Sequence, residues 1–83
     1  MFKDLTPATA ALYIKMIQEA EYENVDGFNN ALMDFTKSER GNLTDLKKKG
    51  LVDTWSDPDV PGYLWVEFTN IEFAEMIQIA LKG

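Results

Sequence analysis

Apolar residues recur at helical spacing through most of the first half of this chain and at strand spacing through part of the second half. The first start signal is Thr6-Pro7, because threonine can cap a helix and proline suits the first helical position. A helix is therefore predicted from there to about residue 20. Its apolar side is made of Leu12, Ile14, Met16, Ile17 and Ala20.

A short second helix is predicted at residues 28–35, after the turn signal Asp26-Gly27. Apolar residues recur in this segment at a spacing that is typical of about two helical turns. They are Phe28, Ala31, Leu32 and Phe35.

A third helix is predicted from about Lys37 to Lys49. Thr36 is a candidate N-cap, and Glu39 stands three residues further on, as the capping-box pattern requires. Gly50 is a natural C-terminal stop for this helix. Leu43 and Leu46 are its predicted inward residues.

The pattern then becomes extended. Leu51–Ser56 and Tyr63–Thr69 are predicted strands, and the turn-rich segment Asp57–Gly62 separates them. In the second strand apolar residues alternate with Tyr63, Trp65 and Glu67, so one face of the strand is purely apolar. The two strands are predicted to form a β-hairpin, and the aromatic residues on its other face to make cross-strand pairs.

Thr69 or Asn70 is the expected cap of a final helix. Two of its sides are apolar, which is more than a lone surface helix needs, and a homodimer through this helix is therefore one expectation. The first side consists of Ile71, Ala74, Ile77, Gln78 and Leu81, and the second of Phe73, Met76 and Ala80.

The expected fold class is α+β and mainly α, in one domain over residues 1–83. Three helices, a two-stranded β-hairpin wing and a C-terminal helix follow one another. This order is the plan of a winged helix-turn-helix, in which the third helix enters the major groove of DNA.

Residues 42–52, with the sequence Asn-Leu-Thr-Asp-Leu-Lys-Lys-Lys-Gly-Leu-Val, resemble the end of the recognition helix of MarR-type and related winged-helix regulators. In those families a leucine precedes a charged stretch, and Lys-Gly-Leu-Val leads into the first wing strand. The later Phe68-Thr69-Asn70 is similar to their Leu-Thr step after the wing. The resemblance covers residues 28–75 and implies a DNA-binding regulator, although the segment Asp34–Ser38 departs from the usual turn sequence.

Composition narrows the chemistry. The chain has no cysteine and no histidine, which removes thiolate nucleophiles, the commonest general base and the commonest metal ligands. No glycine-rich phosphate loop and no carboxylate beside a nucleophile is visible, so no catalytic residue, metal or cofactor is expected and the chain is not predicted to be an enzyme. No secretory signal or apolar run of about 20 residues is seen, which predicts no membrane partner and a cytoplasmic protein.

Charge is segregated along the chain, although the total is −6. Residues 36–50 carry five basic and two acidic side chains, whereas residues 51–83 carry one basic and six acidic ones. This basic helix is the candidate DNA-binding element of a small transcriptional regulator or accessory factor. The candidates for base contacts are Ser38, Arg40, Asn42 and Thr44, and those for phosphate contacts are Lys37, Lys47, Lys48 and Lys49.

The predicted wing points to a second hypothesis, because it carries carboxylates and neither lysine nor arginine. Carboxylates repel phosphates, and tryptophan and tyrosine are enriched at protein interfaces. The alternative is therefore an acidic winged-helix module that binds a protein, for example within a transcription or nucleic-acid complex, and does not itself bind DNA. Its candidate contact residues are Asp57, Asp59, Tyr63 and Trp65.

Overall fold

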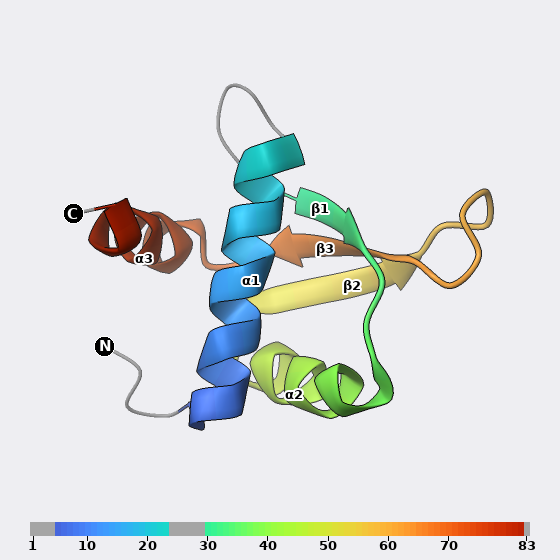
Figure 1. The fold of residues 1–83 in the computed structure, drawn as a ribbon, viewed down its shortest axis with the longest axis horizontal. Coiled ribbons are helices and arrows are strands. Elements are labelled where there is room, and N and C mark those ends of the chain that lie inside the picture. The colour runs from blue at the N-terminus through green and yellow to red at the C-terminus, as the bar shows by residue number, and fades with distance from the viewer. Residues whose placement is uncertain (1–4, 24–29, 83) are drawn as a thin grey trace.

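Three helices and three strands make up the part of the chain that this computed structural model describes, residues 5–23 and 30–82. Figure 1 shows α1 crossing the sheet, with α2 beside one half of α1 and α3 beyond one end of the strands. The molecule is a small α+β fold and mainly helical. The elements are α1 (Pro7–Glu23), β1 (Asn30–Met33), α2 (Lys37–Lys48), β2 (Val52–Ser56), β3 (Leu64–Phe68) and α3 (Ile71–Lys82).

The first helix confirms the prediction from its start signal. The Thr6 hydroxyl accepts a hydrogen bond from the backbone N–H of Thr9 at 3.2 Å, and Pro7 is the first helical residue. The helix continues one turn beyond the predicted end, to Glu23. Its buried side faces the sheet and the other helices, and includes Leu12, Tyr13, Met16, Ile17 and Ala20.

The predicted helix at residues 28–35 is wrong for the part that the structure describes. Residues 30–33 form the strand β1, and Phe28 lies outside the described residues. Ala31 and Met33 are buried while Leu32 between them is half-buried, which is the alternation of a strand. The segment pairs with β3 along its whole length, and this pairing outweighs the local helical spacing.

The sheet has the strand order β1-β3-β2, with both neighbouring pairs antiparallel. The predicted hairpin is confirmed as β2 and β3, and β1 makes the sheet three-stranded instead of two-stranded. Since β1 and β2 are each antiparallel to β3, they run parallel to one another with β3 between them. The unit β1-α2-β2 is therefore a split crossover.

The predicted third helix is confirmed as α2. The Thr36 side chain accepts from the backbone N–H of Glu39 at 3.1 Å, and the Glu39 carboxylate accepts from the backbone N–H of Thr36 at 2.9 Å. These two bonds form the predicted capping box. At the other end, Gly50 adopts φ +72°, a left-handed conformation that ends the helix and that glycine adopts without strain.

The last helix, α3, packs through its buried side, and polar contacts near its C-terminal end hold it against α1. Asn70 is the cap, because its side-chain oxygen accepts from the backbone N–H of Phe73 at 3.2 Å. Ala74 and Ile77 are buried. Further along, Gln78 donates a hydrogen bond to Glu21 of α1, and Lys82 lies 3.6 Å from the same carboxylate.

The core lies between α1 and the inner face of the sheet, and Tyr13 is at its centre. The Tyr13 ring meets Phe68 of β3 edge-on, with centroids 6.0 Å apart, and stacks on Phe73 of α3 at 5.7 Å. Leu43 and Leu46 bring α2 into the same cluster. This packing fixes which side of α2 is turned to solvent.

Candidate functional site

The exposed side of α2 is the most basic surface of the described chain. With about 3.6 residues per turn, the inward direction is set by the buried residues Leu43 and Leu46. Four cations are exposed within about 100° of one another around the helix, and they form no ion pair within residues 5–23 and 30–82. We call this set the cationic face: Lys37, Arg40, Lys47 and Lys48.

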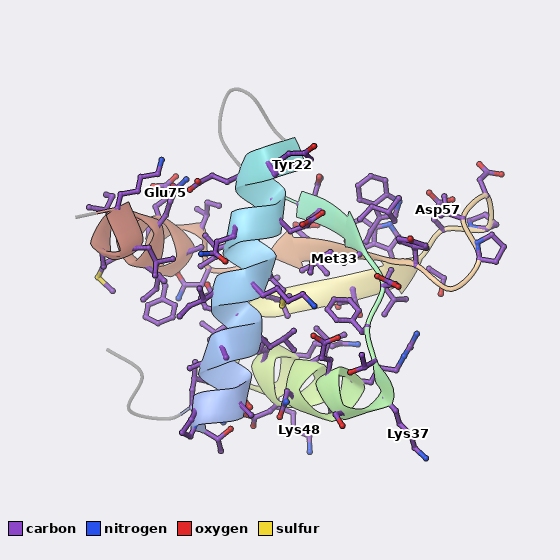
Figure 2. All side chains as sticks on the ribbon, in the orientation of Figure 1. Tyr22, Met33, Lys37, Lys48, Asp57 and Glu75 are labelled. Carbon is purple, nitrogen blue, oxygen red and sulfur yellow. The ribbon has the colours of Figure 1, made fainter. Side chains whose placement is uncertain are left out.

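The cationic face extends along nearly the whole helix. Lys37 begins the helix and Lys48 ends it, so the two lie about 16 Å apart along the axis at 1.5 Å per residue. Figure 2 shows both side chains at the margin of the molecule, directed away from the sheet. Thr44 is exposed between them, and its hydroxyl donates to the carbonyl of Arg40 at 3.0 Å.

The two acidic residues of α2 do not oppose these cations. Glu39 is half-buried and forms a 2.8 Å ion pair with Lys15 of α1. This bond lowers the pKa of Glu39, with the bond to Thr36 as a further cause, and it raises the pKa of Lys15. Asp45 forms a 2.7 Å ion pair with Lys49. Both carboxylates are therefore neutralised beside the cationic face.

Two of the candidate contact residues lie off this face. Asn42 is half-buried, and its side-chain oxygen accepts a hydrogen bond from the Thr9 hydroxyl of α1 at 3.3 Å. The Lys49 ammonium donates a hydrogen bond to the Asp45 carboxylate. The structure therefore brings Lys37, Arg40, Lys47 and Lys48 together with Thr44, places Ser38 at the edge of the same exposed side, and gives Asn42 a packing role.

Gly41 is exposed in the middle of α2 and was not among the predicted site residues. A glycine inside a helix is unfavourable by roughly 0.5–1 kcal/mol relative to alanine. A Cβ added to Gly41 would meet nothing within 4 Å, so packing within the described chain does not require the glycine. Its spacing of four from Lys37 and three from Thr44 is the signal that places it on this face.

The helix-turn-helix part of the expected fold is not formed by the described residues. The element before α2 is the strand β1, and residues 34–36 join the two. The support behind α2 comes instead from α1, through the Lys15–Glu39 ion pair and the Thr9–Asn42 hydrogen bond. A single helix resting on α1 thus presents the cationic face.

The β2–β3 hairpin loop carries the alternative contact residues. Asp57 is used within the loop, because its carboxylate accepts from the backbone N–H of Asp59 and from the indole N–H of Trp65, both at 2.9 Å. These bonds lower the pKa of Asp57, the backbone bond most. Asp59 and Tyr63 are exposed, whereas Trp65 is half-buried. Figure 2 shows Asp57 at the far end of the hairpin from the helices.

Met76, Ile79 and Leu81 of α3 are exposed, with 70% of the Ile79 surface accessible. Met76 and Leu81 belong to the two apolar sides expected from the sequence, Ile79 does not, and dimerisation through this helix stays a prediction. Among residues 5–23 and 30–82, no group of three or more acidic side chains is placed to hold a metal ion, and no helix has both the length and the apolarity needed to cross a bilayer.

Comparison of the chain with protein-family models, curated proteins and solved structures finds no match. The function is therefore inferred from the residues and their geometry alone.

Proposed function

We propose that this protein binds double-stranded DNA through α2, with the cationic face against the major groove. The observation that carries the proposal is a set of four exposed cations on one side of one helix, none of which forms an ion pair with another described residue. An α-helix fits the major groove, and lysines along it contact phosphates while arginine reads base edges. The winged-helix regulators that the sequence resembles also place a helix in the major groove, although the described residues of this chain form no helix-turn-helix; a small regulator or accessory factor is the role that this binding mode suggests.

The division of roles follows from position. Arg40 lies within the helix between the terminal lysines, and it is the candidate for a two-fold hydrogen bond to guanine. Lys37, Lys47 and Lys48 are candidates for phosphate contacts. Gly41 supports close approach, because a residue without a side chain lets the helix backbone come nearer to a partner.

The hairpin does not take part in this binding mode. Its loop carries Asp57 and Asp59 and no basic residue, so phosphates repel it. Figure 1 shows the loop projecting beyond the ends of β2 and β3, whereas α2 lies alongside β2, on the side away from β3. We therefore assign the DNA contact to the helix and exclude the wing.

The test is fluorescence anisotropy of a labelled mixed-sequence duplex, titrated with protein over a range of salt concentrations. We expect salt-dependent binding, because each phosphate contact contributes about 0.9 to the slope of log K against log salt. Lys48→Gln should weaken binding and reduce that slope by about one contact.

The matched control is Lys82→Gln, which removes the same charge from α3 and should leave the slope unchanged. Equal effects of the two variants would mean that only the net charge matters. Absence of binding at low salt, where screening is weakest, would refute the proposal.

A further inference from the structure

The sheet has a second face, which is turned away from α1. Residues that pair directly across neighbouring strands point to the same face, and successive residues alternate. Ala31, Val66 and Thr54 pair across the three strands on the inner face. The intervening residues form two rows on the outer face, and all of them are exposed or half-buried. The rows are Leu32, Trp65 and Trp55, and Asn30, Glu67 and Asp53.

The first of these rows is apolar and aromatic; we call it the aromatic row. Leu32 pairs with Trp65, and Trp65 pairs with Trp55. Because strands lie about 4.8 Å apart, the row extends about 10 Å across the sheet. Trp55 is 44% exposed, and the indole N–H of Trp65 is held by Asp57. The row thus joins an exposed tryptophan, Trp55, to a half-buried one whose indole is held in place, and tryptophans that reach the surface are enriched at binding sites.

The charged residues in the two rows of this face are both acidic. Glu67 and Asp53 occupy the second row, about 7 Å along the strands from the aromatic row. Neither carboxylate forms an ion pair in the described part of the chain. The sequences of β1, β2, β3 and the hairpin loop contain no lysine or arginine. Such a surface repels nucleic acid and a second copy of itself, and attracts a cation.

We infer that the outer sheet face binds an arginine-bearing segment of a protein partner, with a guanidinium stacked on Trp55 and directed toward Glu67 and Asp53. Arginine fits because its planar guanidinium stacks on an aromatic ring and forms forked hydrogen bonds to carboxylates. Lysine supplies the same charge without this planar geometry. The inference is independent of DNA binding by α2, since it uses the opposite charge and different elements.

The test uses the intact 83-residue chain and a fluorescein-labelled peptide of alternating arginine and serine, compared with the same peptide containing lysine. At about 0.15 M salt, where exposed charges are screened beyond about 8 Å, we expect the arginine peptide to bind at least about threefold more tightly. Trp55→Ala should remove most of that difference. Glu67→Gln should weaken the arginine peptide by about two- to fivefold.

Glu75→Gln is the matched control, because it removes one exposed carboxylate from α3, and it should leave peptide binding unchanged. Folding of each variant is verified by circular dichroism, and amide shift changes in the wild-type chain should centre on Trp55 and Glu67. Equal binding of the two peptides, equal weakening by Glu75→Gln, or no binding would overturn the inference. Lys48→Gln changes the cationic face on α2 and should leave peptide binding unchanged. The result of the peptide experiment is therefore independent of whether the protein binds DNA.

Discussion

A buried hydroxyl stands out at the scale of single residues. Tyr13 is fully buried, and its oxygen has no hydrogen-bond partner among the described residues. Burial raises the pKa of Tyr13 to about 12. The ring itself fills the centre of the core against Phe68 and Phe73. The hydroxyl therefore adds desolvation without a compensating bond, while the ring contributes packing.

Tyr13→Phe is expected to raise the free energy of unfolding by about 1 kcal/mol at neutral pH, because it keeps the ring and removes an unpaired buried hydroxyl. The folded pKa lies above the ordinary value of about 10, so wild-type stability is lost as pH rises from about 10 toward 12. The variant should lose less over that range. Urea unfolding at neutral pH and at a pH between about 10 and 12 measures the free energy of unfolding of both proteins. Replacement of the exposed Tyr63 by phenylalanine is the control. A destabilised Tyr13→Phe variant would contradict the reasoning.

The hydrogen bond between the Asp57 carboxylate and the Trp65 indole gives a second prediction at the scale of single residues, and it can be followed by NMR. The carboxylate that accepts the Trp65 indole N–H has a lowered pKa, so it stays ionised below the pH at which an ordinary aspartate is protonated. Its contribution to stability is present above the unfolded pKa of about 3.9 and is lost as pH falls through the folded pKa.

We expect the Trp65 indole N–H resonance to shift with pH at a midpoint below that of a free aspartate. The exposed Trp55 indole gives the internal control in the same two-dimensional NMR spectra. A Trp65 resonance that does not shift as the carboxylate is protonated would show that the carboxylate does not hold the indole, whereas a shift at the ordinary aspartate midpoint would contradict the lowered pKa.

At the scale of the elements, two glycines, one inside α2 and one at its end, have opposite effects on stability. Gly41 lies within α2 in a helical conformation, and Gly50 follows the helix with φ +72°. An added Cβ would meet nothing within 4 Å at either position. Local backbone conformation alone therefore decides the effect of alanine at each site.

Gly41→Ala should stabilise the protein by roughly 0.5–1 kcal/mol, because alanine is the better helix former. Gly50→Ala, the matched control, should destabilise it by about 1 kcal/mol, since a left-handed backbone is unfavourable for alanine. Thermal and urea unfolding measure both. If DNA approaches the cationic face closely, Gly41→Gln should keep the fold and weaken binding, and unchanged binding would place the contact elsewhere.

The elements also differ in how far the sequence predicts them. Local signals are sufficient for α1, α2 and α3, because the caps at Thr6, Thr36 and Asn70 act on the next few residues. The hairpin is predicted by its alternation and its turn residues. The strand β1 is missed because residues 28–35 fit a helical spacing, and only pairing with β3, distant in sequence, makes the segment extended.

The same distinction applies to the candidate site. The cluster of cations on α2 follows from the sequence, but the rotation of the helix is set by packing on α1, which turns Asn42 inward. The use of Asp57 within its own loop requires the hairpin geometry. The aromatic row includes Leu32, which joins Trp65 only because β1 is a strand, so no local pattern could have predicted it.

At the scale of the whole molecule, charge is divided between two surfaces. The cationic face lies on α2, and the outer sheet face carries Glu67 and Asp53, so a net charge of −6 hides a dipolar arrangement. A strongly acidic total therefore does not by itself exclude a local contact with phosphates. It does favour one orientation of approach, with α2 toward a polyanion and the sheet away from it.

The strand order has a consequence for synthesis on the ribosome. Met33 of β1 is made 31 residues before Leu64, its register partner on β3. At translation rates of about 5–20 residues per second, the synthesis of Leu64 follows that of Met33 by about 2–6 seconds, and β3 is the strand that pairs with β1 in the described part of the chain. Throughout that interval Ala31 and Met33 lack the pairing that makes residues 30–33 extended and helps to bury them.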